Sequence, residues 1–208
     1  MNSDDATETD LVRVVLGDAN VLYSRVLRDY LLYAADQEVI SIVWSGRILE
    51  EVTRHLVANV AGFTEESGKR LVSGMNAAFP SAEVEATVEH YQRLRVDSLP
   101  DEDDRHVLAA AVAAEASVLC TANTKDFPGS VTSSLGVETM TPDALLCLLI
   151  TEFEPQMLAA HASAVASMRG ATDVRCPVAG RDRVGVPRSK AVAETGRVSP
   201  NVLATMWA

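Results

Sequence analysis

The sequence predicts an α/β fold, in which a central parallel sheet of four to five strands is flanked by helices. Two observations predict it. Short aliphatic runs, of a length that suits buried strands, recur along the chain. Segments with apolar residues spaced three or four apart, typical of helices, separate these runs, and strands that alternate with helices form parallel sheets. We expect this fold over residues 11–150.

Four aliphatic runs are the predicted strands. The first two, Val12–Gly17 and Val39–Trp44, are almost entirely apolar, as strands buried on both faces are. Ser117–Thr121 and Val137–Met140 are shorter. A fifth segment, Glu83–Val88, alternates polar and apolar residues, which is typical of a short strand.

Helical spacing predicts the segments between these strands. After the first strand, six apolar residues fall near one face: Val21, Leu22, Val26, Leu27, Leu31 and Leu32. Ser45 suits the N-cap of the next helix, whose inner face carries Ile48, Leu49, Val52 and Leu56. Further helices are expected at Thr64–Ala77, from about Asp103, after Pro142 and at Gln156–Met168.

Composition indicates a globular protein with an aliphatic core, since 48% of the residues are hydrophobic and only 5% are aromatic. No apolar stretch approaches the roughly 20 residues that a membrane-spanning helix needs. The N-terminus is acidic and polar, unlike a secretory signal. We therefore expect a cytoplasmic protein with no membrane partner. The three cysteines and four histidines show no spacing typical of disulfide frameworks or zinc sites.

The net charge of −11 is unevenly distributed. Residues 1–10 form an acidic tail, whereas basic residues outnumber acidic ones from Arg175 onward. We expect residues 151–208 to form a helix followed by a poorly ordered basic tail. The alternative is that the basic tail is an arm that binds RNA or a partner. The net charge does not exclude RNA, but a site rich in carboxylates needs cations before it accepts a phosphate.

Acidic and amide side chains lie where predicted strands end or helices begin. They are Asp18 after the first strand, Glu51 in the helix after the second, Asp101, Asp103 and Asp104 at a helix start, and Asn123 and Asp126 after the third strand. Taken singly, each has a structural explanation as a turn, a helix cap or part of a solvated face. Taken together, they point to one crevice at the carboxyl ends of the strands.

Carboxylates gathered in one crevice repel each other unless a cation lies among them. Oxygen ligands without His or Cys suit Mg²⁺ or Mn²⁺ better than Zn²⁺. Such ions activate water and stabilise the charge that develops on a phosphoryl group. The residues alone therefore predict a metal-dependent phosphodiesterase.

The chain also resembles PIN domains, and VapC-type toxin ribonucleases in particular, over about Val12–Ile150. Four segments carry the resemblance, in the order and spacing typical of that family: DANVLYS, SGRILEEV, PDEDDRHVLAAAV and CTANTKDFP. It implies a PIN-like three-layer fold and a Mg²⁺-dependent endoribonuclease. It also implies the toxin half of a bacterial toxin–antitoxin pair, with RNA as the substrate and a cognate antitoxin protein as a partner. Whether the chain forms a homodimer stays open.

The resemblance further implies roles for single residues. The catalytic acids are Asp18, Glu51, Asp104 and Asp126, and the metal ligands are Asp18, Asp104, Asp101 and Asp126. Glu51 fits the second segment better than Glu50, because an aliphatic residue follows it.

The fourth segment departs from the family pattern. Asn123 stands where the family commonly has Asp, so that either Asp126 supplies the carboxylate or Asn123 serves as a neutral group behind the metal ligands, as Asn20 does beside Asp18. The number of bound metals stays open. Candidate contacts to the RNA backbone are Arg25, Arg105 and Lys125, together with Arg28, Arg47 and Arg54.

Two other functions compete with this hypothesis. A haloacid-dehalogenase-type phosphatase also has an Asp after its first strand, but it needs a second Asp two residues later, where this chain has Asn20. The other is a degenerate PIN module that binds RNA or a partner without cleaving, an alternative that Asn123 keeps open.

Overall fold

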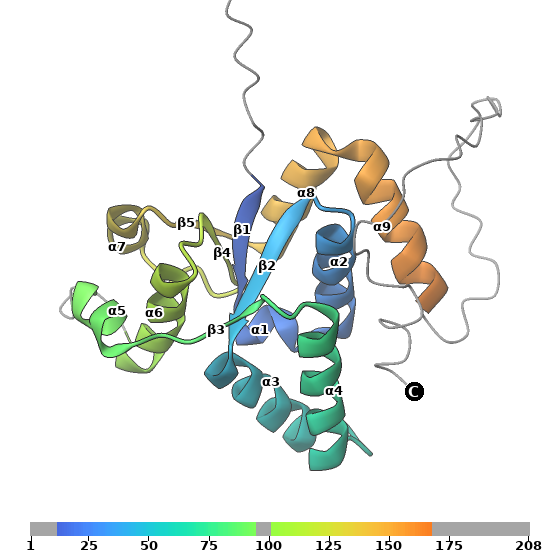
Figure 1. Cartoon of the computed structure of the whole chain (residues 1–208), viewed down its shortest axis with the longest axis horizontal. Helices are drawn as coiled ribbons and strands as arrows, with labels where there is room; N and C mark the ends of the chain where they lie inside the picture. The colour runs from blue at the N-terminus through green and yellow to red at the C-terminus, as the bar shows by residue number, and fades with distance from the viewer. Residues whose placement is uncertain (1–11, 95–100, 168–208) are drawn as a thin grey trace, which may run out of the picture.

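The computed structural model describes residues 12–94 and 101–167 and contains one five-stranded parallel sheet, with strand order β3-β2-β1-β4-β5 (Figure 1). The strands are β1 Arg13–Gly17, β2 Ile40–Ser45, β3 Glu83–Val84, β4 Val118–Cys120 and β5 Glu138–Met140. The predicted α/β fold with a parallel sheet is therefore confirmed.

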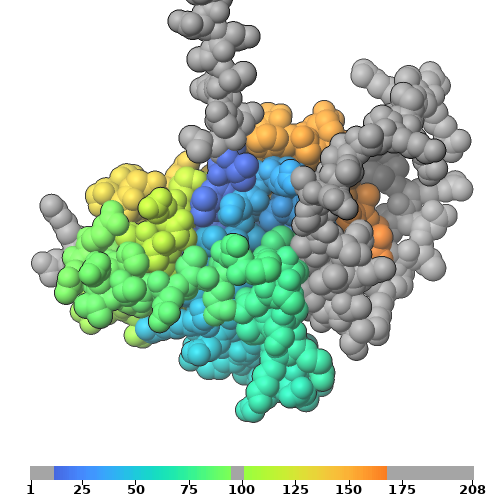
Figure 2. Space-filling view, in the orientation of Figure 1, coloured from blue at the N-terminus to red at the C-terminus, as the bar shows by residue number. Residues whose placement is uncertain are grey.

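The helices form the outer layers of this three-layer fold. They are α1 Ala19–Leu22, α2 Arg25–Asp36, α3 Gly46–Asn59, α4 Glu65–Ala78, α5 Val88–Arg93, α6 Arg105–Ala113, α7 Gly129–Thr132, α8 Pro142–Glu152 and α9 Glu154–Ser167. In Figure 1, α2 and α9 lie on one side of the sheet, and α6 with α5 lies on the other. Figure 2 shows that α4 and α5 form much of the surface on the face in view.

Strand β1 lies at the centre of the sheet and sets the position of its neighbours. Val15 of β1 is paired with Ile42 of β2 on one side and with Val118 of β4 on the other. All three side chains are buried, which explains why these strands read as aliphatic runs. Because the strands are parallel, the residues that follow β1, β2 and β4 meet at one edge of the sheet, which we call the carboxyl edge.

The predicted first helix is divided into α1 and α2. The Ser24 hydroxyl caps α2 by accepting a hydrogen bond from the Leu27 N–H, and the Arg28 guanidinium donates to the Leu22 carbonyl at the end of α1. This break rotates Val26 away from the core, and its side chain is 47% exposed, although the apolar spacing predicted it on the inner face.

The segment Glu83–Val88 is not the six-residue strand that its alternation predicted. The strand β3 ends at Val84, and Val88 instead begins α5, where it is 71% exposed. The Thr87 N–H donates to Nδ1 of His90 at 3.0 Å, so a local helix cap outweighs the alternating pattern.

The last described helix packs on the same core as the sheet. Its buried residues Met157, Ala160 and Ala164 join the main hydrophobic cluster, and α9 lies along α2. The Tyr30 and His161 rings stack at this contact, with centroids 5.9 Å apart. This helix corresponds to the predicted Gln156–Met168, whereas the acidic tail over residues 1–10 and the basic tail beyond Met168 lie outside the described residues.

Across residues 12–94 and 101–167, no helix combines the length and the apolar character that crossing a membrane requires.

Candidate functional site

A cavity of about 420 Å³ opens at the carboxyl edge of the sheet. Five of the residues predicted from sequence line it: Asp18, Glu51, Asp104, Asn123 and Asp126. Asn20 is a sixth predicted residue in the lining. These residues come from four segments that are widely separated in sequence, and we call the cavity the acidic pocket.

Asp18 is fixed at the base of the acidic pocket by three hydrogen bonds. Its Oδ1 accepts from the Ala19 N–H at 2.6 Å, and its Oδ2 accepts from the Thr121 hydroxyl at 2.7 Å and from Nδ2 of Asn20 at 2.6 Å. The side chain is only 6% exposed. Burial raises the pKa of Asp18, and the hydrogen bonds from Thr121 and Ala19 oppose that rise.

Asn20 connects the ends of β1 and β4. Its Nδ2 also donates to the Thr121 hydroxyl at 3.0 Å, while its Oδ1 accepts from the Ala122 N–H at 2.9 Å. The predicted position of Asn20 beside Asp18 is thus observed. Thr121 was not predicted, although it ends the β4 run directly across from Asp18.

Glu51, and not Glu50, faces the acidic pocket from α3. Its Oε1 lies 3.8 Å from Nε of Arg47 and 3.3 Å from Nε2 of His106. Glu50 is exposed and lines a different cavity, on the side of α3 that faces α4. Adjacent residues on a helix point about 100° apart, so Glu51 faces the acidic pocket while Glu50 faces the other cavity.

Asp104 ends the 3₁₀ turn Glu102–Asp104, directly before α6. Burial and the nearby carboxylates of Asp126, Asp101, Asp18 and Glu51 together raise the pKa of Asp104 to about 6, with burial the largest cause. The carboxylates of the acidic pocket are therefore close enough to repel one another.

The remaining predicted site residues differ in whether they line the acidic pocket. Asn123 donates from Nδ2 to Oδ2 of Asp126, so the amide and the carboxylate that were predicted as alternatives line the pocket as a pair. Asp101 is exposed and does not line the pocket; its Oδ1 accepts from the Asp103 N–H at 2.9 Å and caps the turn that carries Asp104.

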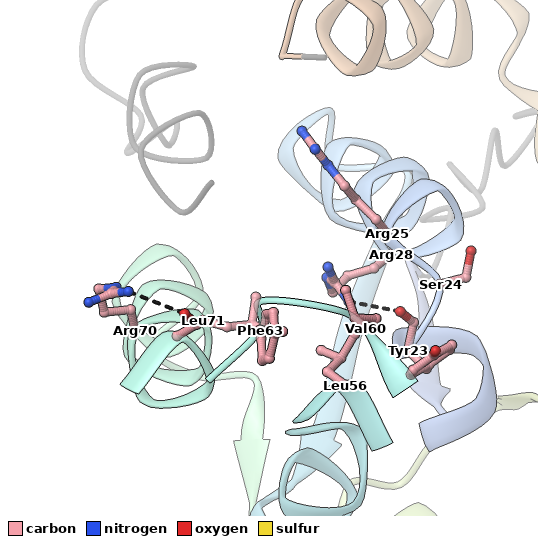
Figure 3. A pocket seen from close by; sticks show the side chains of 10 residues that line it. Tyr23, Ser24, Arg25, Arg28, Leu56, Val60, Phe63, Arg70 and Leu71 are labelled. Atoms are coloured by element: carbon pink, nitrogen blue, oxygen red, sulfur yellow. Dashed lines mark hydrogen bonds between the residues drawn. The ribbon is translucent and has the colours of Figure 1, made fainter. Parts of the chain in front are cut away.

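Two of the predicted RNA contacts, Arg25 and Arg28, line a second cavity of about 500 Å³ between α2, α3 and α4, which we call the arginine cavity (Figure 3). Arg28 is 1% exposed and donates to the carbonyls of Leu22 and Tyr23, so it cannot reach a substrate in solvent. Arg25 lies 3.7 Å from the carboxylate of Asp29. Proximity in sequence to Asp18 did not reveal that the break between α1 and α2 turns both arginines away.

The other predicted cations also differ in position. Arg105 is half-buried and does not line the acidic pocket, and Arg54 lines the same cavity as Glu50. Arg47 contacts Glu51, and Lys125 is exposed beside Asp126. Arg47 is therefore the predicted cation that contacts a pocket acid directly among the described residues.

Sequence reasoning missed four residues in or behind the acidic pocket. Tyr23, His55 and Asn59 line it, and His106 is buried behind Glu51. His55 and Asn59 follow Glu51 by four and eight residues on α3, a spacing that places all three on one side of the helix and that was available in the sequence.

The donor set of the acidic pocket fits a hard divalent cation, because all its ionisable lining groups except His55 and Tyr23 are carboxylates. In the described part of the chain, however, no three His, Cys, Asp or Glu side chains stand close enough together to hold one metal ion. Asp18, Asp126 and Glu51 each contact a protein group, namely Thr121, Asn123 and His106.

Comparison with known proteins gives one match. A family model described as the PIN domain matches residues 13–125, which is more than half of the chain and includes Asp18, Glu51 and Asp104. Neither the curated proteins nor the solved structures yield a significant match.

Proposed function

This chain belongs to the PIN domain family, and we propose that it is a metal-dependent endoribonuclease that hydrolyses RNA phosphodiester bonds. PIN domains are typically metal-dependent nucleases, so family membership indicates nuclease activity in general. RNA as the substrate, Mg²⁺ or Mn²⁺ as the metal and the role as a toxin are our proposals.

One observation carries the proposal: Asp18, Glu51, Asp104 and Asp126 converge from four segments on one pocket. Burial and the neighbouring carboxylates raise the pKa of Asp104, which reduces the stability of the fold at neutral pH. Helix capping and turn formation do not require this convergence. A bound divalent cation does, because it needs several oxygen ligands from one place.

We propose that Asp18, Asp104 and Asp126 hold the metal, with Glu51 beside them. When bound, Mg²⁺ or Mn²⁺ supplies an activated water and neutralises charge on the phosphate. The protein's own groups orient the ligands: Thr121 and Asn20 fix Asp18, and Asn123 fixes Asp126. Asp101, predicted as a ligand, contributes by capping the turn that carries Asp104.

We further propose that the substrate is single-stranded RNA. A pocket lined by carboxylates repels phosphate until a cation is bound, so affinity for RNA before metal binding must come from other groups. Tyr23 and His55 offer ring faces on which unpaired bases stack, and Asn59 offers an amide at the same wall. Lys125, exposed beside Asp126, is suited to contact the RNA backbone.

The resemblance to VapC-type toxins supports a role as the toxin of a toxin–antitoxin pair, with a cognate antitoxin as its protein partner. Induced expression of the full chain in bacteria tests this role. We expect growth arrest with the wild-type chain and normal growth with Asp18→Asn at equal protein level. Arrest by both proteins would show that toxicity does not depend on the acidic pocket.

Cleavage of RNA by the purified full chain tests the activity itself. We expect cleavage of single-stranded RNA with Mg²⁺ or Mn²⁺, none with EDTA, and none by Asp18→Asn with either metal. Cleavage that persists in EDTA would overturn the metal-dependent mechanism.

A second candidate function, binding of RNA without cleavage, is favoured by Asn123 in place of an acid and by the open arrangement of the carboxylates. Metal-independent RNA binding without any cleavage would support it. The phosphatase alternative lacks its second Asp at Asn20, and the chain belongs to the PIN domain family instead.

A further inference from the structure

His106 is a buried polar residue that lies directly behind the acidic pocket. It is the second residue of α6, and its side chain is only 4% exposed. Its Nδ1 lies 2.6 Å from the Asp103 carbonyl oxygen, and its Nε2 lies 3.3 Å from Oε1 of Glu51. Nε2 is buried and makes no hydrogen bond in the described residues. The ring therefore directs one nitrogen to the backbone and the other to a carboxylate of the pocket.

The chemistry of the Asp103 contact fixes the orientation of the ring. A carbonyl oxygen only accepts hydrogen bonds, so Nδ1 must carry a proton and donate it to Asp103. With that bond made, the ring plane is set and Nε2 points at Glu51. A buried nitrogen without a partner destabilises the fold. Oε1 of Glu51 lies within ion-pair distance of this nitrogen.

His106 also contacts two separate segments of the chain that each carry an acid of the pocket. Through the Asp103 carbonyl it contacts the Glu102–Asp104 turn, which carries Asp104, and through Nε2 it contacts Glu51 on α3. Arg47 also contacts Glu51, but its side chain is 54% exposed and its Nε lies 3.8 Å from Oε1, so solvent screens this contact. The contact of Glu51 with the buried imidazole is therefore less screened by solvent than its contact with Arg47.

We propose that His106 is a positioning residue, which holds Glu51 and the turn of Asp104 at a fixed separation so that both carboxylates serve one metal site. This inference rests on the proposed function in one respect, namely that the two carboxylates act on a metal. The contact itself is a property of the metal-free protein and is testable there.

Two substitutions at His106 test the roles of the two ring nitrogens separately. The amide nitrogen of His106→Asn lies near the position of Nδ1 and keeps the bond to Asp103, whereas that of His106→Gln reaches toward the position of Nε2 and keeps the contact with Glu51. His161→Gln is the matched control, because His161 also has a ring nitrogen in contact with a neighbour, Tyr30, but lies on α9.

Mn²⁺ affinity by titration calorimetry and kcat and KM for RNA cleavage are the first readouts. Loss of a group that orients a metal ligand typically costs about 10- to 100-fold in metal affinity or activity. We expect a loss of this size in Mn²⁺ affinity and kcat for His106→Asn, a smaller loss for His106→Gln, and none for His161→Gln. Unchanged values for both His106 variants, or a larger loss for Gln than for Asn, would overturn the proposal.

A double-mutant cycle with His106→Asn and Glu51→Gln, measured by urea unfolding of the metal-free chain, is the second readout. We expect the two substitutions to be coupled in stability. Purely additive effects would overturn the contact whether or not the protein is a nuclease. If the wild-type chain neither binds Mn²⁺ nor cleaves RNA but the coupling is present, the proposed function fails and the contact between His106 and Glu51 stands.

Discussion

The acidic pocket and the arginine cavity are both lined by clustered charges, but the charges differ in what surrounds them. In the arginine cavity, Arg28 donates to backbone carbonyls, Arg25 lies beside Asp29, and Arg70 lies beside Glu66. In Figure 3 these arginines extend from α2 and α4 without meeting at one point. In the acidic pocket, carboxylates from four segments line one cavity, and burial together with the neighbouring carboxylates raises the pKa of Asp104.

The comparison shows which charge clusters indicate function. Charged groups that hydrogen-bond to their own neighbours serve the fold, as Arg28 does at the end of α1. Like charges brought together from distant segments oppose folding and require another explanation, which we propose is a bound divalent cation. Each prediction below tests one side of this contrast.

The largest expected effect is on cleavage by Asp18→Asn. Asn keeps the shape and much of the hydrogen bonding of Asp18 but removes a charge from the proposed metal site. Since loss of an orienting group already costs about 10- to 100-fold, loss of a ligand should reduce kcat by at least about 100-fold. Circular dichroism should show an unchanged fold. Full Mg²⁺-dependent activity in this variant would place the site elsewhere.

Glu51→Gln and Glu50→Gln form a matched pair on α3. Glu51 faces the acidic pocket and Glu50 faces away, so we expect a loss of about tenfold or more for Glu51→Gln and little change for Glu50→Gln. Steady-state cleavage assays on the two variants measure the difference. The reverse order would mean that the family alignment is shifted by one residue.

Arg28→Met tests the arginine cavity. The substitution fills similar space but leaves the Leu22 and Tyr23 carbonyls without their donor, which costs about 1–3 kcal/mol of folding free energy. Urea unfolding should show this loss, while kcat per folded molecule stays near the wild-type value. A stable variant with impaired cleavage would show that the arginine cavity acts in function.

The smallest expected effect is the pH dependence of Asp104. The pKa of this carboxyl is raised from 3.8 to about 6, so the folded state binds a proton that the unfolded state has released between these pH values. Stability from this group is therefore lost as pH rises from about 4 through 6. We expect Asp104→Asn to unfold at a higher temperature than the wild-type chain at pH 7.5 in EDTA.

The two chains should converge near pH 4, where Asp104 is largely neutral. Thermal unfolding at both pH values measures the difference. Added Mg²⁺ should stabilise the wild-type chain more than Asp104→Asn, and equal stabilisation would argue against Asp104 as a ligand.

The sheet and the acids at its carboxyl edge were predictable because they depend on local patterns. Aliphatic runs identify β1, β2 and β4 wherever both faces are buried, and an acid after such a strand must lie at its end. The family pattern, in which an aliphatic residue follows the Glu, selected Glu51, and Glu51 is the glutamate of the pair that lines the acidic pocket.

Features that depend on side-chain contacts between helices were not predictable in this way. The Ser24 cap and the bond from Arg28 to Leu22 break a helix whose apolar spacing is continuous. The contact between His106 and Glu51 joins α6 to α3, two helices that both pack against β2. The spacing of apolar residues in α3 and α6 does not predict this contact.

The pairing of β1 with β4 has a consequence for the time at which the protein becomes active. The Thr121 hydroxyl that fixes Asp18 lies 103 residues further along the chain, and Asp126 comes later still. Ordering contacts between such distant residues is slow, because a long loop must close first. A growing chain on the ribosome therefore lacks an assembled pocket until its β4 segment has emerged. If the protein cleaves RNA, it cannot cleave the messenger RNA from which it is translated during most of its own synthesis.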